Sequence, residues 1–180
     1  GVPLIVDNTF PTPINCRPIE FGADIVTHST TKYMDGHAVQ VGGVIVDSGN
    51  FNWDNGKFPM LTQPDESYHG VVYTQQFDKA AYITKARTHL MRDLGAIQSP
   101  QHAFYLNLGL ESLHVRMARH CENGQAVAEF LAEHYPVPVV RHGVNDVFGR
   151  SGKAEKVLEA YGLTPEGVVE KARAALAKKQ

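Results

Sequence analysis

The chain has 180 residues, of which 43% are hydrophobic, and this length is enough to bury one sizeable core. Its 17 basic and 19 acidic residues leave a formal charge of -2, which argues against a nucleic-acid partner, because such surfaces are rich in Lys and Arg. No apolar stretch approaches the length of a membrane span. The two cysteines, Cys16 and Cys121, form no CxxC pair, so we expect a cytoplasmic protein.

The first element in the chain is an apolar strand at residues 2–6, which ends in Asp7. The chain begins abruptly on this strand, as a fragment would, and lacks the charged segment of a signal peptide. An Asp at the carboxyl end of a buried strand points into the crevice where α/β proteins bind ligands. Such a carboxylate can hold a pyridinium nitrogen protonated. Taken alone, Asp7 is equally explained as a turn residue or a helix N-cap.

Short elements follow. Two prolines at residues 9–13 predict a rigid loop, because each proline removes a backbone donor. Residues 15–21 predict a short helix that Gly22 closes as a C-cap. Apolar runs at residues 23–27 and 39–46 predict two further strands.

The connection between those two strands carries the chemistry. Residues 28–37 read HSTTKYMDGH, and α/β proteins place functional groups in such loops. The hydroxyls of Ser29 and Thr31 can donate hydrogen bonds to phosphate oxygens. The amine of Lys32 becomes a nucleophile toward carbonyls where desolvation lowers its pKa. The alternative is an ordinary solvated turn, since short motifs often match by chance.

Three stretches together carry a family resemblance: VDNTF at residues 6–10, GADIV at 22–26 and HSTTKY at 28–33. In order and spacing they resemble the Cys/Met-metabolism family of pyridoxal phosphate (PLP) enzymes, and within it the O-acetylhomoserine sulfhydrylases. The resemblance implies that PLP is the cofactor and that Lys32 is the Schiff-base lysine. It implies that Asp7 pairs with the pyridine nitrogen, and that Ser29 and Thr31 bind the cofactor phosphate. It also implies an amino-acid substrate and a homo-oligomer.

Helical patterns occupy the middle of the chain. Apolar spacing predicts a helix over residues 77–94, ended by Gly95. Ser99 and Pro100 predict the start of a second helix, and residues 111–134 predict a third, amphipathic one. We expect this third helix to bury a set of apolar side chains: Leu113, Met117, Cys121, Val127, Phe130 and Leu131. The histidines occur singly, so we expect no metal site, although His28 and His37 flank Lys32 and could touch bound substrate.

The family pattern stops near residue 134. The sequence then predicts a strand at residues 136–141 and two helices at 154–161 and 165–177, with Thr164 as an N-cap. Residues 148–152 (FGRSG) and 159–164 (EAYGLT) resemble the C-terminal end of the transketolase family. Gly149 and Gly152 could bind an anion before a helix, but an ordinary loop is the simpler interpretation.

These observations predict an α/β fold, a three-layer sandwich with a mixed, largely parallel sheet. Residues 1–134 would be part of a type I PLP-transferase large domain, and residues 135–180 a transketolase-like end packed on the same sheet. The family's Gly-rich phosphate turn and stacking aromatic upstream of Asp7, and its carboxylate-clamping arginine, are not visible here. We therefore expect a sulfur amino-acid transferase with little turnover. The alternatives are an inactive, structural or designed chimera and a transketolase-type C-terminal subunit.

Overall fold

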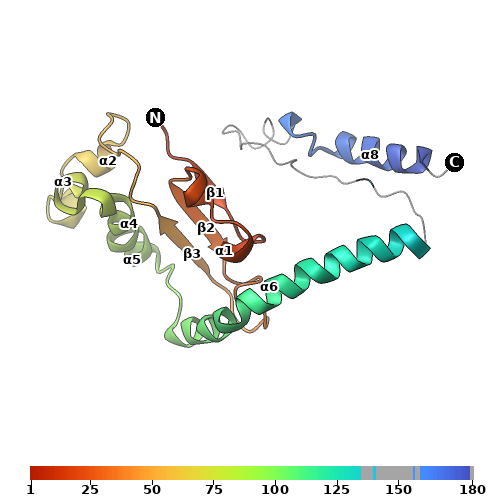
Figure 1. Ribbon diagram of the computed structural model, residues 1–180. Coiled ribbons are helices and arrows are strands. Elements are labelled where there is room, and N and C mark those ends of the chain that lie inside the picture. The colour runs from red at the N-terminus through yellow and green to blue at the C-terminus, as the bar shows by residue number, and fades with distance from the viewer. Residues whose placement is uncertain (135–139, 141–155, 157–158, 179–180) are drawn as a thin grey trace. The chain divides into compact units, whose positions relative to one another are not determined.

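The computed structural model of the chain describes residues 1–134, 140, 156 and 159–178. Contacts divide the chain into two compact units, Gly1–Arg119 and His120–Gln180 (Figure 1). The predicted domain boundary near residue 134 and the packing of the C-terminal end on the sheet stay predictions. The first unit contains the sheet and every candidate site residue.

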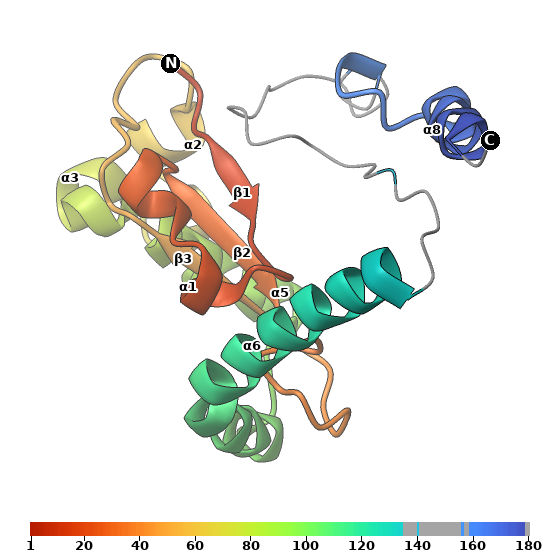
Figure 2. The ribbon, with the colours of Figure 1, turned by 45° about the vertical axis from the view of Figure 1, so that its right-hand side comes forward.

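The sheet has three strands in the order β1 (Ile5–Asp7), β2 (Ile25–Ser29) and β3 (Gly43–Asp47), which Figure 2 shows side by side. The first pair is parallel and the second antiparallel, so the sheet is mixed, as predicted. The third strand was predicted from residue 39 but begins at Gly43. Residues 39–42 lie in the loop instead, because Asp35 accepts a hydrogen bond from the Val39 amide.

One layer of helices packs on the Ile25 face of the sheet. A buried cluster of Ile25, Trp53, Leu61, Tyr73 and Ala81 joins the two layers. The short helices of this layer are α2 (Pro59–Thr62), η2 (Glu66–Tyr68), α3 (Tyr73–Phe77), η3 (Asp78–Ala80), α4 (Ala81–Lys85), η4 (Ala86–Met91) and α5 (Arg92–Leu94). The predicted helix over 77–94 is continuous only from Ala81, because Asp78 takes a positive φ of 45° and interrupts it. Gly95 ends it at a φ of 67°, as predicted.

A second layer covers the opposite face. It contains α1 (Thr12–Asn15), η1 (Pro18–Phe21) and the N-terminal half of α6 (Pro100–His134). The predicted helix over 15–21 is thus two short pieces, and Thr12 extends into the predicted proline loop. Gly22 closes η1 with a φ of 96°, as predicted. The three layers confirm the predicted α/β sandwich.

The long helix differs from its prediction in two ways. The sequence predicted two helices meeting near residue 110, but α6 runs unbroken through Gly109, and Ser99 caps its start as predicted by accepting from the His102 amide. Of the side chains predicted to be buried, Leu113 and Met117 are buried. Cys121, Val127 and Phe130 are exposed and Leu131 is half-buried, whereas Leu113 and Met117 belong to a buried cluster with Met34.

The second unit ends in helix α8 (Pro165–Ala177). The Thr164 hydroxyl caps it by accepting from the Gly167 amide, and Pro165 takes the first helical position, both as predicted. The FGRSG stretch, residues 154, 155, 157 and 158 of the predicted helix over 154–161, and the predicted strand at 136–141 apart from residue 140 lie outside the described residues. In the described part of the chain, no helix is both long and apolar enough to cross a membrane.

Candidate active site

Asp7 and Ser29 reach the same end of the sheet. Asp7 is the last residue of β1 and lies opposite Thr27 of the parallel strand β2, whose last residue is Ser29. Side chains alternate along a strand, so Asp7, Thr27 and Ser29 share one face. The prediction that Asp7 ends a buried strand is wrong: β1 is an edge strand, with Ile5 55% exposed. The location of the carboxylate at the carboxyl end of that strand is confirmed.

Thr9 fixes the Asp7 carboxylate. The Thr9 hydroxyl donates to Asp7 Oδ1 at 2.6 Å, and the Thr9 amide donates to the same oxygen at 3.0 Å. These two bonds, the hydroxyl bond first, lower the pKa of Asp7, because they stabilise the charged form. Asp7 is therefore an ionised acceptor at neutral pH, which is the state that a pyridinium N–H group requires.

The same hydroxyl links the two strand ends. The Ser29 amide donates to Thr9 Oγ1 at 2.7 Å, so the chain of hydrogen bonds runs from Ser29 through Thr9 to Asp7. Thr9 is buried, at 6% exposure, and the sequence alone did not single it out as a residue of the candidate site. The signal was present, because an Asp followed two residues later by Thr is typical of a side-chain-to-backbone turn.

Lys32 lies in a tight turn at residues 30–35, directly after β2. The Asp35 amide donates to the Thr30 carbonyl at 3.1 Å, and the Gly36 amide donates to the Lys32 carbonyl at 2.9 Å. The start of the turn is held by the buried Gln40 side chain, which donates to the Thr30 carbonyl at 2.8 Å. The Lys32 side chain itself is exposed, so a well-held backbone presents an accessible amine.

The two predicted phosphate ligands differ in their surroundings. Ser29 is half-buried at the end of β2, on the Asp7 face. The Thr31 hydroxyl accepts from the Gly42 amide at 3.1 Å and lies 3.4 Å from the Gly42 carbonyl. Thr31 therefore closes the loop onto the start of β3, and its hydroxyl would have to leave the Gly42 carbonyl to donate to a phosphate.

The two histidines beside the turn have different roles. His28 is 6% exposed and lies on the opposite face of β2 from Ser29, since neighbouring side chains alternate. Burial lowers the pKa of His28, against the opposing effects of the Asn8 backbone and the Asp7 charge, so it is a neutral core residue. His37 is exposed, and its Nδ1 lies 2.7 Å from the Asp35 carbonyl. Within the described residues, no group of three or more His, Cys, Asp or Glu side chains could hold a metal ion.

The donor set fits PLP. An ionised carboxylate, a serine hydroxyl and an accessible lysine amine lie at one end of two parallel strands. A carboxylate matches a pyridinium nitrogen, and a lysine amine matches the cofactor aldehyde.

Comparison with known proteins identifies the family. The Cys/Met metabolism PLP-dependent enzyme family matches residues 1–149. This chain belongs to that family. An O-acetyl-L-homoserine sulfhydrylase of Leptospira meyeri is 42% identical over 187 aligned residues, which cover 96% of this chain. A homocysteine/cysteine synthase of Kluyveromyces lactis is 50% identical over 134 residues, or 73% of this chain. PLP, the cofactor in the family's description, agrees with the sequence prediction.

A solved structure shares the fold. A protein described as an O-acetylhomoserine (thiol)-lyase of Campylobacter jejuni matches 74% of this chain with a TM-score of 0.68 and 33% identity. That structure carries N'-pyridoxyl-lysine-5'-monophosphate. The chain spans less than half of these relatives: 42% of the Leptospira protein, 30% of the Kluyveromyces protein and 33% of the Campylobacter chain.

The same comparisons bear on the predicted junction. The family match extends to residue 149, and the Leptospira alignment covers 96% of the chain. Similarity to the family therefore continues beyond residue 134, and the predicted junction near that residue stays a prediction. The transketolase resemblance of the last forty or so residues stays a prediction.

Proposed function

We propose that this chain carries the lysine half of a PLP site in an O-acetylhomoserine sulfhydrylase-like transferase of sulfur amino-acid metabolism. The observation that carries the proposal is the β1–β2 register, which brings Asp7 to the strand end from which Ser29 and the Lys32 turn emerge. Relatives named as sulfhydrylases and homocysteine synthases support the substrate class.

Each site residue has one task in this proposal. Asp7, held ionised by Thr9, would accept a hydrogen bond from the protonated pyridine nitrogen of PLP. Ser29 donates its hydroxyl to the phosphate, and Thr31 joins it if its hydroxyl turns from the Gly42 carbonyl. Lys32 holds the cofactor through its amine and moves a proton at Nζ. When bound, PLP supplies the electron sink that stabilises negative charge on the substrate.

The overall reaction would replace acetate on the γ carbon of O-acetylhomoserine with sulfide, giving homocysteine and acetate. We expect low turnover from this chain alone, because it matches only 42% of the length of the Leptospira relative. Cofactor binding, and not turnover, is therefore the decisive test. A homo-oligomer and a cytoplasmic location are the corresponding proposals for assembly and compartment.

The test uses visible absorbance of the protein after incubation with PLP and desalting. Wild-type protein should retain a yellow band that borohydride fixes to the peptide containing Lys32, as identified by mass spectrometry. Lys32→Ala should lose the band. Lys57→Ala is the matched control, because Lys57 is an exposed lysine in the loop before α2, and it should behave as wild type.

Two outcomes separate the alternatives. A retained band with slow release of acetate from O-acetylhomoserine supports the transferase. No retained band, or equal labelling of Lys32 and Lys57, contradicts the proposed site and favours the inactive structural module. The transketolase-type subunit would instead require co-purification with a larger chain.

A further inference from the structure

Arg116 of helix α6 binds the backbone of the Lys32 turn. Its Nη1 donates to the Tyr33 carbonyl at 2.8 Å, and its Nη2 lies 3.5 Å from the Met34 carbonyl. Tyr33 and Met34 are the two residues that follow Lys32, yet they lie more than eighty positions before Arg116 in the sequence. A cationic side chain from a distant helix therefore holds the backbone beside the candidate Schiff-base lysine.

The guanidinium is itself held in place. Its Nη2 donates to the Gly109 carbonyl at 2.8 Å, and its Nε donates to the Ser112 hydroxyl at 3.0 Å. Arginine suits this role because its planar group presents several donors in a fixed geometry. A lysine at the same position would keep the positive charge but could not serve the turn and the helix together.

Two glycines make room for this contact. A Cβ atom at Gly109 would lie 2.3 Å from the Asp35 carbonyl oxygen, so α6 can approach the turn only because residue 109 has no side chain. A Cβ atom at Gly36 would lie 2.5 Å from Arg116 Nη1. Gly109 thus makes room for the backbone of the turn, and Gly36 makes room for the guanidinium.

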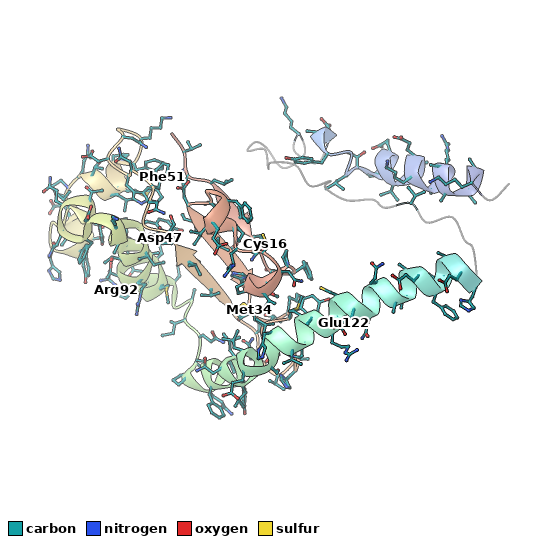
Figure 3. The ribbon with its side chains drawn as sticks, viewed as in Figure 1. Cys16, Met34, Asp47, Phe51, Arg92 and Glu122 are labelled. Atoms are coloured by element: carbon teal, nitrogen blue, oxygen red, sulfur yellow. The ribbon has the colours of Figure 1, made fainter. Side chains whose placement is uncertain are left out.

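Apolar packing reinforces the contact. Met34, labelled in Figure 3, is buried against Leu113 and Met117 of the same helix. The Lys32 turn therefore rests on α6 through a side chain of the turn and through its carbonyls. Apolar packing has little directional preference, whereas the hydrogen bonds from Arg116 depend on the orientation of the peptide groups.

We propose that Arg116 is a positioning residue that fixes the backbone of the Lys32 turn, so that the Lys32 amine is presented to PLP in one orientation. This inference rests on the proposed function for its consequence, but its structural part is independent of any cofactor. It assigns a functional role to the first half of α6, which supplies no group to the candidate site itself.

The experiment compares wild type, Arg116→Lys and Arg87→Lys, where Arg87 is an exposed arginine of η4. Amide hydrogen exchange is measured without PLP, and the PLP dissociation constant is then measured by visible absorbance. In Arg116→Lys, amides of residues 32–36 should exchange faster while amides of β2 keep their protection. PLP should bind about tenfold more weakly, as expected for the loss of one charged hydrogen bond. Arg87→Lys should match wild type in both measurements.

The two proposals fail differently. If wild type binds no PLP at Lys32 but Arg116→Lys loosens the turn, the proposed function is wrong and the positioning contact stands. If the turn amides in Arg116→Lys exchange as in wild type, the positioning role is wrong whatever PLP does. If Arg116→Lys does not fold, Ser112→Ala replaces it, because that variant keeps the guanidinium but removes the acceptor of Arg116 Nε, together with the hydroxyl's own bond to the Gly109 carbonyl, and should loosen the same amides to a smaller extent. Unchanged turn amides in Ser112→Ala would then overturn the proposal.

Discussion

Replacing Thr9 with valine tests the electrostatics of the candidate site. Valine has nearly the shape of threonine but lacks the hydroxyl, which donates to Asp7 at 2.6 Å and accepts from the Ser29 amide at 2.7 Å. A hydrogen bond to a charged group contributes roughly 1.5–3 kcal/mol to stability. Because Asp7 is exposed, water competes for its carboxylate, so we expect a loss of about 1–2 kcal/mol at neutral pH.

The loss should depend on pH with a definite sign. The folded-state pKa of Asp7 lies below its ordinary value, so its contribution is present above the unfolded pKa of about 3.9. That contribution disappears as the pH falls through the lower folded pKa. The difference in stability between wild type and Thr9→Val should therefore shrink at about pH 3 without vanishing, because the bond from the Ser29 amide involves no ionisable group.

The assay is urea unfolding followed by circular dichroism at both pH values, with Thr9→Ser as the control. Serine keeps the hydroxyl and loses only a methyl group, so it should lie close to wild type. The valine variant should also bind PLP more weakly than the serine variant. A valine variant as stable as the serine variant at neutral pH would refute the role assigned to the Thr9 hydroxyl. A difference that does not change with pH would refute the involvement of the Asp7 charge.

Two further substitutions test the framework of the first unit. Lys85 and Asp65 form an ion pair in which both side chains are at most 13% exposed, and the pKa of Asp65 is lowered chiefly by Lys85. Lys85→Met should lower stability by about 3 kcal/mol near neutral pH, with less effect below the unfolded Asp pKa of about 3.9, whereas Lys85→Arg should lose little in urea unfolding. Gly109→Ala should cost about 2 kcal/mol, because its Cβ would meet the Asp35 carbonyl. Gly124→Ala, whose Cβ would meet nothing within 4 Å, should be neutral or slightly stabilising. Both glycine variants are measured by thermal unfolding beside wild type.

Local chemistry explains what the sequence predicted correctly. The location of Asp7 and Lys32 at one end of the sheet could be predicted because each comes at or just after the end of an apolar strand, and the ends of parallel strands meet at one edge of a sheet. The glycines at 22 and 95 and the caps at Ser99 and Thr164 were found because their roles depend only on neighbouring residues. Such features need no knowledge of the tertiary structure.

Tertiary contacts explain what the sequence did not predict. Arg116 binds carbonyls 82 and 83 positions away, so nothing in its own surroundings marks it. The absence of a side chain at Gly109 allows the close approach of α6 to the Lys32 turn, and no local pattern reveals that contact. Cys121 was predicted to be buried from its spacing along the helix. Cys121 is exposed. The prediction was wrong because a periodic pattern shows which residues share a face of the helix, and not whether other residues cover that face.

Removing the C-terminal segment separates the lysine site from the rest of the chain. The turn of residues 30–35 is held by hydrogen bonds within residues 29–42 and by Arg116 in the first half of α6. A variant ending at His134 should therefore retain PLP as the complete chain does, with the same protection of turn amides in hydrogen exchange. Equal binding would show that residues 1–134 are sufficient for cofactor retention, whether the following segment derives from this family or resembles transketolase. Weaker PLP binding by the shortened variant would mean that residues 135–180 support the lysine site. The contacts within the first unit would then be insufficient to explain PLP retention.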